Sequence, residues 1–330
     1  MKIEQSRFLV IGGSGFIGSH IVDQLLRLGA SYVGIYDNLS SGSLNNLAHC
    51  LSDPRVHVFA ESSDILHMDL LHDAMKGIDG VFHLAGLWLL HSHQYPRSAF
   101  EVNVRGTMNV VETAIANRVK RLVFSSSASV YGESITQPIN ENAPLSCLDF
   151  YGASKVCGEY IIKSMYHKAS SIEHGLKYNI LRYMNVYGPR QRYDSRYSGV
   201  VASMTNAALL GHELTVFGDG TQSYDFIDAR DCATANCLAM TSDACNDVYN
   251  IGTGRKTSVN ELAKLIIEHC PLALRNPNIR HIENSRPYVT TRFGCTEKAR
   301  ILLGFTHAIE LEEGIRSYLA DRSAKFIQVN

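Results

Sequence analysis

Residues 8–18 read FLVIGGSGFIG and join a short β-rich run, a glycine string and the start of a helical pattern. Apolar residues then recur at helical spacing as far as Leu28, and Gly29 follows as a stop signal. Between a strand and a helix, such glycines allow a tight turn, close approach of a pyrophosphate and close helix packing. The helix N-terminus offers its unpaired N–H groups to the phosphates. The alternative is a plain glycine turn. We predict a dinucleotide-binding unit whose cofactor contacts are Gly12, Gly15, Phe16, Ile17 and Gly18.

An acidic residue ends the next predicted strand. Asp37 follows Tyr32–Tyr36 and lies 19 residues after Gly18. A carboxylate at this place accepts hydrogen bonds from both hydroxyls of an adenosine ribose and repels a 2′-phosphate. The position therefore favours NAD over NADP, although Asp37 could instead only cap a turn with Asn38.

The rest of the chain alternates short β-rich runs with helical ones, which is typical of a parallel sheet with crossover helices. We predict an α/β fold: a Rossmann-type doubly wound sheet with a smaller, interleaved substrate-binding lobe. The NAD-binding domain is expected to span 1–184 with a return segment at about 225–255, and the second lobe 185–224 and 256–330. The predicted strands are Phe8–Ile11, Tyr32–Tyr36, Val56–Phe59, Val81–Leu84, Leu122–Ser125 and Tyr178–Tyr183, and a helix is predicted at Phe100–Ala116.

Composition excludes several classes of protein. With 330 residues, 45% hydrophobic and 19% charged, the chain can bury a sizeable core. Its formal charge of −1 provides no field that attracts nucleic acid or an acidic membrane. The start, Met1 to Phe8, leaves no room for an export signal, and Val81 to Leu90, the longest apolar stretch, is too short to cross a bilayer. We therefore expect a cytoplasmic protein without nucleic-acid or membrane partners.

The cysteines and histidines do not form a recognisable metal motif. Eight cysteines occur without a Cys-x-x-Cys pair, and His91-x-His93 is the only close histidine pair. Reduced thiols in the core are the better interpretation of the cysteines. No metal site is predicted.

A candidate catalytic group lies further along the chain. Tyr151 and Lys155 are four residues apart, so a helix would place both side chains on one face. A nearby cation lowers the pKa of a tyrosine, ordinarily about 10, and makes it a better base. Taken alone, the pair could also be a tyrosine packed on a lysine stem. The residues 125–127, all serine, end a predicted strand at the edge where open α/β sheets hold ligands, which favours the catalytic interpretation.

Several further motifs keep the order and spacing of one family. Besides the glycine loop and residues 37–42, they are Asp64-Ile65, residues 82–85, residues 103–107, residues 125–132, Tyr151–Lys155 and residues 181–191. Together they resemble the extended short-chain dehydrogenases/reductases, and within them the NAD-dependent nucleotide-sugar epimerase/dehydratase family, most of all enzymes similar to UDP-glucose 4-epimerase.

This resemblance implies roles for individual residues. Ser127 would be the hydroxyl beside the substrate, Tyr151 the acid/base, and Lys155 a ligand of the nicotinamide ribose. Asn103 would hold the local backbone, while Tyr183 and Val186 would flank the nicotinamide. Besides the glycine-loop contacts, the implied NAD contacts are Asp37, Asn38, Ser41, Gly42, Asp64, Ile65, Leu84, Ala85, Gly86, Asn103, Ser125, Tyr151, Lys155, Tyr183 and Val186. The implied contacts of a nucleotide-sugar substrate are Ser127, Asn185, Val200, Thr215, Val216, Phe217, Tyr224, Arg192 and Arg286. The family also commonly forms homodimers through the helices expected at Phe100–Ala116 and Ala153–Lys168.

The sequence departs from the family pattern on the substrate side. Tyr224 stands where an arginine is usual, and residues 286–289 read Arg-Pro-Tyr-Val in place of Arg-Pro-Gly-Asp. Either Arg190, Arg192 or Arg196 supplies the lost charge, or the ligand is not an ordinary nucleotide diphosphate sugar.

The residues after Ser127 bear on the type of reaction. Relatives that eliminate water carry Asp-Glu there, and decarboxylating relatives usually keep the Glu, whereas this chain has Ala128 and Ser129. We therefore predict NAD-dependent epimerisation, at C4, of a nucleotide-diphosphate sugar through a 4-keto intermediate. The alternatives are a dehydrogenase or reductase with net redox change, and a cofactor-sensing or scaffold protein without turnover.

Overall fold

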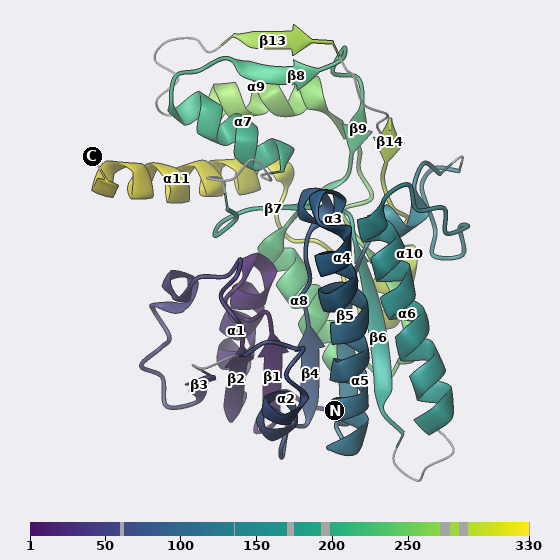
Figure 1. The fold of residues 1–330 in the computed structure, drawn as a ribbon. Coiled ribbons are helices and arrows are strands. Elements are labelled where there is room, and N and C mark those ends of the chain that lie inside the picture. Colours follow the sequence, from purple (N-terminus) through teal and green to yellow (C-terminus); the bar gives the residue numbers. More distant parts are fainter. Residues whose placement is uncertain are drawn as a thin grey trace.

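A seven-stranded parallel sheet forms the centre of the molecule (Figure 1). The computed structural model describes residues 1–59, 63–134, 136–169, 175–192, 199–270, 278–283 and 290–329. The order of the strands across the sheet is β11-β6-β5-β4-β1-β2-β3, with every pair parallel. Their bounds are Arg7–Ile11 (β1), Tyr32–Tyr36 (β2), Val56–Val58 (β3), Gly80–His83 (β4), Arg121–Ser127 (β5), Lys177–Tyr183 (β6) and Asp247–Ile251 (β11).

All six strands predicted from the sequence occur, and their observed ends differ from the predicted ones by two residues at most. Most of their side chains are buried because helices cover both faces, which is why the strands read as continuous apolar runs without polar alternation. The predicted α/β fold class is confirmed.

Helices pack on the two faces of the sheet and form two separate cores. One face carries α1 (Phe16–Arg27), α8 (Ala229–Thr241) and α10 (Glu297–Leu303). The other carries α2 (Met68–Ala74), α5 (Gly106–Ala116) and α6 (Phe150–Ala169). The helix predicted at Phe100–Ala116 begins with a π-helical segment, η2 (Phe100–Arg105), before α5. Shorter helices are η1 (Leu44–Leu47), α3 (Leu89–Gln94), α4 (Pro96–Ala99) and η3 (Ala128–Tyr131).

The second lobe lies above the carboxyl ends of the strands in Figure 1 and has its own core. Short sheets join β7 to β10, β8 to β13, and β9 to both β12 and β14. Their bounds are Asn185–Tyr187 (β7), Leu214–Phe217 (β8), Ser223–Tyr224 (β9), Phe226–Asp228 (β10), Thr257–Ser258 (β12), Ile279–Ile282 (β13) and Thr291–Arg292 (β14). The helices of the lobe are α7 (Val200–Leu209), α9 (Val259–His269) and α11 (Leu311–Val329).

The predicted boundary between the lobes stays a prediction, but one helix bears on it. Ala299, Leu303 and Phe305, in and after α10, are buried in the core around β1, α1 and α8. This part of the segment 256–330, which we assigned to the second lobe, therefore packs with the large sheet.

The order of the strands reverses between β1 and β4, so the connections after these two strands leave toward opposite faces. Ligands of open α/β sheets bind in the crevice outside the carboxyl ends of the strands at such a point. Among the helices of the described residues, none has the length and apolar character needed to cross a membrane.

Candidate active site

A cavity of about 260 Å³ opens at the carboxyl ends of β1, β2, β4, β5 and β6. The predicted cofactor residues that line it are Gly12, Gly15, Phe16, Ile17, Gly18, Asp37, Asn38, Ser41, Gly42, Asp64, Ile65, Leu84, Ala85, Gly86, Ser125, Tyr151, Lys155 and Tyr183. Sequence reasoning missed Ile11, Tyr36, Ser40, Ser63, Leu87, Val102 and Ser126. Ile11, Tyr36 and Ser126 lie at strand ends beside predicted contacts, and that adjacency could have identified them.

The glycine loop leaves no room for side chains. Gly12 adopts φ +85°, and a Cβ added there would lie 3.0 Å from the Ala85 backbone nitrogen. A Cβ on Gly18 would lie 2.1 Å from the Gly12 carbonyl oxygen. No side chain caps the first turn of α1, because Gly15 is its N-cap residue. The loop therefore brings bare backbone and a helix N-terminus to the cavity, which fits a pyrophosphate.

Asp37 is held as a hydrogen-bond acceptor at the end of β2. Its carboxylate accepts hydrogen bonds from the backbone N–H groups of Ser14 and Leu39, both at 2.9 Å. Burial raises the pKa of Asp37, and these backbone hydrogen bonds oppose the rise. A Cβ on Gly42 would lie 2.9 Å from the same carboxylate, so the glycine keeps space beside it. The arrangement fits the two hydroxyls of an adenosine ribose.

Two predicted cofactor residues do not line the cavity. Asn103, in the π-helical segment η2, accepts a hydrogen bond from the backbone N–H of Leu87 at 2.7 Å and donates to the Leu87 carbonyl at 3.0 Å. It also donates to the Ser154 hydroxyl at 2.9 Å. It fixes the loop after β4 to α6, in keeping with the implied role of holding the backbone. Val186 packs against the core on the α1 side of the sheet.

The three predicted catalytic residues lie close together, and two of them, Tyr151 and Lys155, line the cavity. Ser127 ends β5 and caps η3, accepting a hydrogen bond from the Ser129 N–H. Tyr151 and Lys155 project from the first turns of α6, and the lysine Nζ lies 5.7 Å from the tyrosine ring centroid. A side-chain hydrogen bond joins Ser127 to the Tyr151 phenol. The lysine Nζ donates to the Ser125 carbonyl at 2.8 Å.

The pKa values of this pair differ from the expectation. We expected Lys155 to lower the pKa of the phenol, but burial raises the pKa of Tyr151 to about 12, with only the Ser127 hydrogen bond opposing the rise. Burial also lowers the pKa of Lys155 to about 8 against the opposing charge of Glu159. The cause in both cases is removal from water, which disfavours the charged forms of both groups.

A buried polar network supports the site from behind. Glu159, one turn after Lys155, accepts hydrogen bonds from the Ser126 hydroxyl at 2.7 Å and from Arg182 at 2.6 and 2.8 Å. Arg182 also donates to the Tyr131 hydroxyl at 2.8 Å and to the Glu141 carbonyl at 3.1 Å. The network ties β5, β6, η3 and α6 together, and sequence reasoning did not identify it because its members are far apart in the chain.

None of the predicted substrate residues lines this cavity, as far as the described residues show. Asn185 opens β7 with its side-chain Nδ2 buried and without a partner. Thr215 and Phe217 are exposed on β8, whereas Val216 between them is buried in the core of the second lobe, so only its backbone can reach a ligand. Val200 begins α7, Tyr224 lies on β9, and Arg192 is exposed. Arg286 and Arg196 lie outside the described residues.

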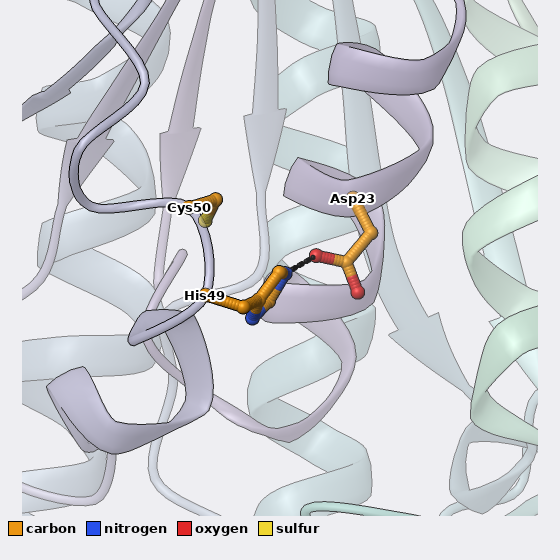
Figure 2. Close-up of side chains that lie close together, drawn as sticks. All are labelled: Asp23, His49 and Cys50. Carbon is orange, nitrogen blue, oxygen red and sulfur yellow. Dashed lines mark hydrogen bonds and ion pairs between the residues drawn. The ribbon is translucent and has the colours of Figure 1, made fainter.

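Arg190 is not placed to supply the charge that Tyr224 lacks. Its guanidinium pairs with Asp23 of α1 at 2.8 Å. The other oxygen of Asp23 accepts a hydrogen bond from His49 at 2.8 Å, with Cys50 beside them (Figure 2). Side chains of these three types can bind metals, but both oxygens of the carboxylate are already engaged, and burial raises the pKa of the Cys50 thiol. The cluster ties the segment after β7 to α1.

Comparisons with known proteins place this chain among epimerases and dehydratases that act with NAD. Residues 8–252 match the family model described as "NAD dependent epimerase/dehydratase family". A putative UDP-glucose 4-epimerase of Methanocaldococcus jannaschii is 37% identical over 93% of this chain and 95% of its own length.

Two solved structures share the whole architecture. The UDP-glucose 4-epimerase of Thermotoga maritima, solved with UDP-glucose, has a TM-score of 0.86 and 34% identity, covering 97% of this chain and 99% of its own. A UDP-N-acetylglucosamine 4-epimerase from Methanobrevibacter ruminantium, in complex with UDP-N-acetylmuramic acid, has a TM-score of 0.90 and 30% identity, covering 98% and 99%. The protein is an enzyme that uses NAD, and its chain belongs to the NAD-dependent epimerase/dehydratase family.

Proposed function

We propose that this enzyme inverts C4 of a UDP-linked hexose or hexuronate. The observation that carries the proposal is that Tyr151 and Lys155 line a cavity suited to a dinucleotide, while Ser127 is hydrogen-bonded to the Tyr151 phenol. The relatives named as 4-epimerases of UDP-sugars support the choice of substrate class.

The side chains have separate tasks in this reaction. NAD, when bound, supplies the acceptor and donor of a hydride. The Tyr151 oxygen removes the proton from the C4 hydroxyl of the sugar and later returns it. Ser127, which is hydrogen-bonded to the phenol, holds the reacting oxygen of the sugar against it. The 4-keto sugar turns in the site between the two proton transfers, so the proton returns after the opposite face of C4 has been reduced.

Lys155 adjusts the acidity of the site in its protonated form. The Lys155 Nζ lies 5.7 Å from the ring centroid of Tyr151, and an ammonium ion near a phenolate stabilises it once the phenol has lost its proton. Glu159, which works against the lowering of the Lys155 pKa, helps to keep that ammonium charged.

The residues beside Ser127 favour epimerisation over elimination. Ala128 and Ser129 are buried in η3 and carry no acid. The carboxylate that acts on the pKa of Tyr151 is Asp149, and it accepts a hydrogen bond from the Gly152 N–H at 2.7 Å at the start of α6. A second acid/base of the kind that loss of water requires is therefore missing among the described neighbours of Ser127 and Tyr151.

The test is an NMR assay of the holoenzyme with UDP-glucose, UDP-N-acetylglucosamine and UDP-glucuronate, together with the absorbance of NADH. We expect the C4-inverted sugar to appear without accumulation of NADH. Steady production of NADH would instead indicate a dehydrogenase, and bound NAD without any turnover would indicate a scaffold.

We also propose a homodimer that works in the cytoplasm. The support for the dimer is that α5, with the preceding η2, and α6 lie on one face, where Phe100 of η2 and Tyr160 of α6 remain 46% and 58% exposed. The eight free cysteines are compatible with a reducing compartment. Light scattering coupled to size-exclusion chromatography would show a particle of twice the chain mass, and a monomer would contradict the dimer.

A further inference from the structure

Arg292 lies beside the position at which the substrate side departs from the family pattern. It is the second residue of β14, which pairs in parallel with β9, and its register partner is Tyr224. Partners across neighbouring strands extend their side chains from the same face of a sheet. Arg292 therefore faces the region that Tyr224 faces, on a different strand.

The guanidinium reaches from the second lobe toward the catalytic residues. Its Nη2 donates to the carbonyl of Gly132 at 3.4 Å, and Gly132 ends the turn of η3 that Ser127 begins. Asp149, two residues before Tyr151, also acts electrostatically on it. Arg292 thus lies between the Ser127 turn and the start of α6.

Arg292 is poorly paired for a charge that is partly buried. The side chain is partly buried, its Nε is buried without a hydrogen-bond partner, and its one hydrogen bond within the described residues is the long one to Gly132. Burial lowers its pKa. Arg182, by contrast, is engaged by both oxygens of Glu159, by Tyr131 and by the Glu141 carbonyl. Because a buried donor without a partner is costly, the guanidinium of Arg292 is better satisfied when an anion binds it.

The backbone around Arg292 is held firmly on both sides. The Thr291 carbonyl accepts a hydrogen bond from the Gln137 side chain at 2.8 Å, and the Phe293 carbonyl accepts one from the Ile139 N–H at 2.9 Å. On the other side, the Arg292 carbonyl accepts the Asp225 N–H at 3.0 Å. The guanidinium is therefore presented from a rigid base, which reduces the entropy lost when a ligand binds.

We propose that Arg292 binds the anionic group of the substrate and supplies the positive charge that is missing at Tyr224. The inference rests on the proposed function, since it takes the substrate to be a UDP-sugar. The forked donors of a guanidinium suit both a diphosphate and a carboxylate, so the shared chemistry is an oxyanion. The oxyanion comes either from the diphosphate, common to all UDP-sugars, or from C6 of a hexuronate.

The experiment compares Arg292→Gln and Arg292→Lys with the wild-type holoenzyme. The matched control is Arg300→Gln, which removes an arginine that is 58% exposed on α10 and pairs with Glu297. Calorimetry gives Kd for UDP and for uridine, and kinetics give KM for UDP-glucose and UDP-glucuronate. Retained NAD and the melting temperature report on folding. A structural arginine would lower the melting temperature when replaced, whereas removal of a poorly paired buried charge leaves it equal or higher.

We expect Arg292→Gln to weaken anion binding about 10- to 100-fold, as loss of a charge-assisted hydrogen bond does, with partial recovery in Arg292→Lys. If Arg292 binds the diphosphate, the variant has a higher Kd for UDP and an unchanged Kd for uridine, and KM rises equally for both UDP-sugars. If the carboxylate is bound, only KM for UDP-glucuronate rises. Unchanged values for both nucleotides and both sugars would overturn the inference and leave the proposed function intact. A wild type that neither binds UDP nor converts a UDP-sugar would overturn the proposed function, and this inference with it.

Discussion

The cofactor half and the substrate half of the site are built by different means. In the cofactor half, bare backbone and short side chains at the ends of five parallel strands form the cavity, and polar groups such as Asp37 and Asn103 are held by backbone hydrogen bonds. In the substrate half, most candidate contacts stand on short strands, β7, β8, β9 and β14, of two to four residues, and two of them, Asn185 and Arg292, carry buried atoms without partners.

The difference has a physical reason. A dinucleotide presents the same phosphates and riboses to each enzyme that binds it, so backbone geometry can recognise it and leaves little freedom in the sequence. A substrate is distinguished by side chains, and a positive charge can move to a neighbouring strand without any change of the backbone. We therefore expect backbone changes to matter most in the cofactor half and side-chain changes to matter most in the substrate half.

The largest effect is expected where the two halves meet. Replacing Tyr151 by phenylalanine removes the oxygen that exchanges a proton with the substrate and keeps the ring in its place. We expect kcat to fall about 10³-fold, within the range for loss of a general acid/base. Bound NAD, measured by absorbance after denaturation, should not change.

Tyr160→Phe is the matched control, because this tyrosine is 58% exposed on the same helix. It should keep the wild-type rate. A Tyr151→Phe enzyme with wild-type turnover would remove Tyr151 from the chemistry.

The sequence predicted the cofactor half of the site better than the substrate half. The glycine loop, Asp37 and the Tyr-x-x-x-Lys spacing predicted a cavity that the structure builds from those residues, because each motif acts through local backbone geometry. The pKa of Tyr151 could not be predicted in the same way, since the burial that dominates it depends on how the whole chain packs around the phenol. The partner strand of Tyr224 was equally hidden, because β14 joins β9 across 68 residues of sequence.

The second prediction tests whether backbone alone builds the cofactor half. Gly18 lies in the first turn of α1, where alanine would ordinarily favour a helix by about 1 kcal/mol. The added Cβ would lie 2.1 Å from the Gly12 carbonyl, so the loop must shift. We expect Gly18→Ala to weaken NAD binding about 10- to 100-fold, the equivalent of an overpacking cost of about 1–3 kcal/mol, as measured by calorimetry.

Gly77→Ala is the comparison for this variant. Gly77 also has a special backbone, at φ +68°, but no atom lies within 4 Å of an added Cβ. It should lose some stability and keep its affinity for NAD. Equal loss of NAD affinity in both variants would mean that general destabilisation, and not the contact at Gly12, sets the affinity.

The smallest expected effect is a pH dependence of stability that comes from Lys155 in the cofactor half and not from Arg292 in the substrate half. Burial lowers the pKa of Lys155 to about 8 from its ordinary value of 10.5. Between these two values the unfolded chain holds a proton that the folded chain has released, so this group makes the folded protein more stable as pH rises. From pH 7.5 to 9.5, the free energy of unfolding of NAD-free wild type should therefore rise by roughly 2 kcal/mol relative to Lys155→Met. Urea unfolding at both pH values measures this rise. Lys120→Met, at a side chain 68% exposed, should keep the same rise as the wild type, because it still contains Lys155. Arg292→Gln should also keep it, because a guanidinium holds its proton throughout this range. If wild type and Lys155→Met showed the same change of unfolding free energy between the two pH values, the Lys155 ammonium would stay charged in the folded protein. Lys155 and Arg292 would then differ only in what they bind.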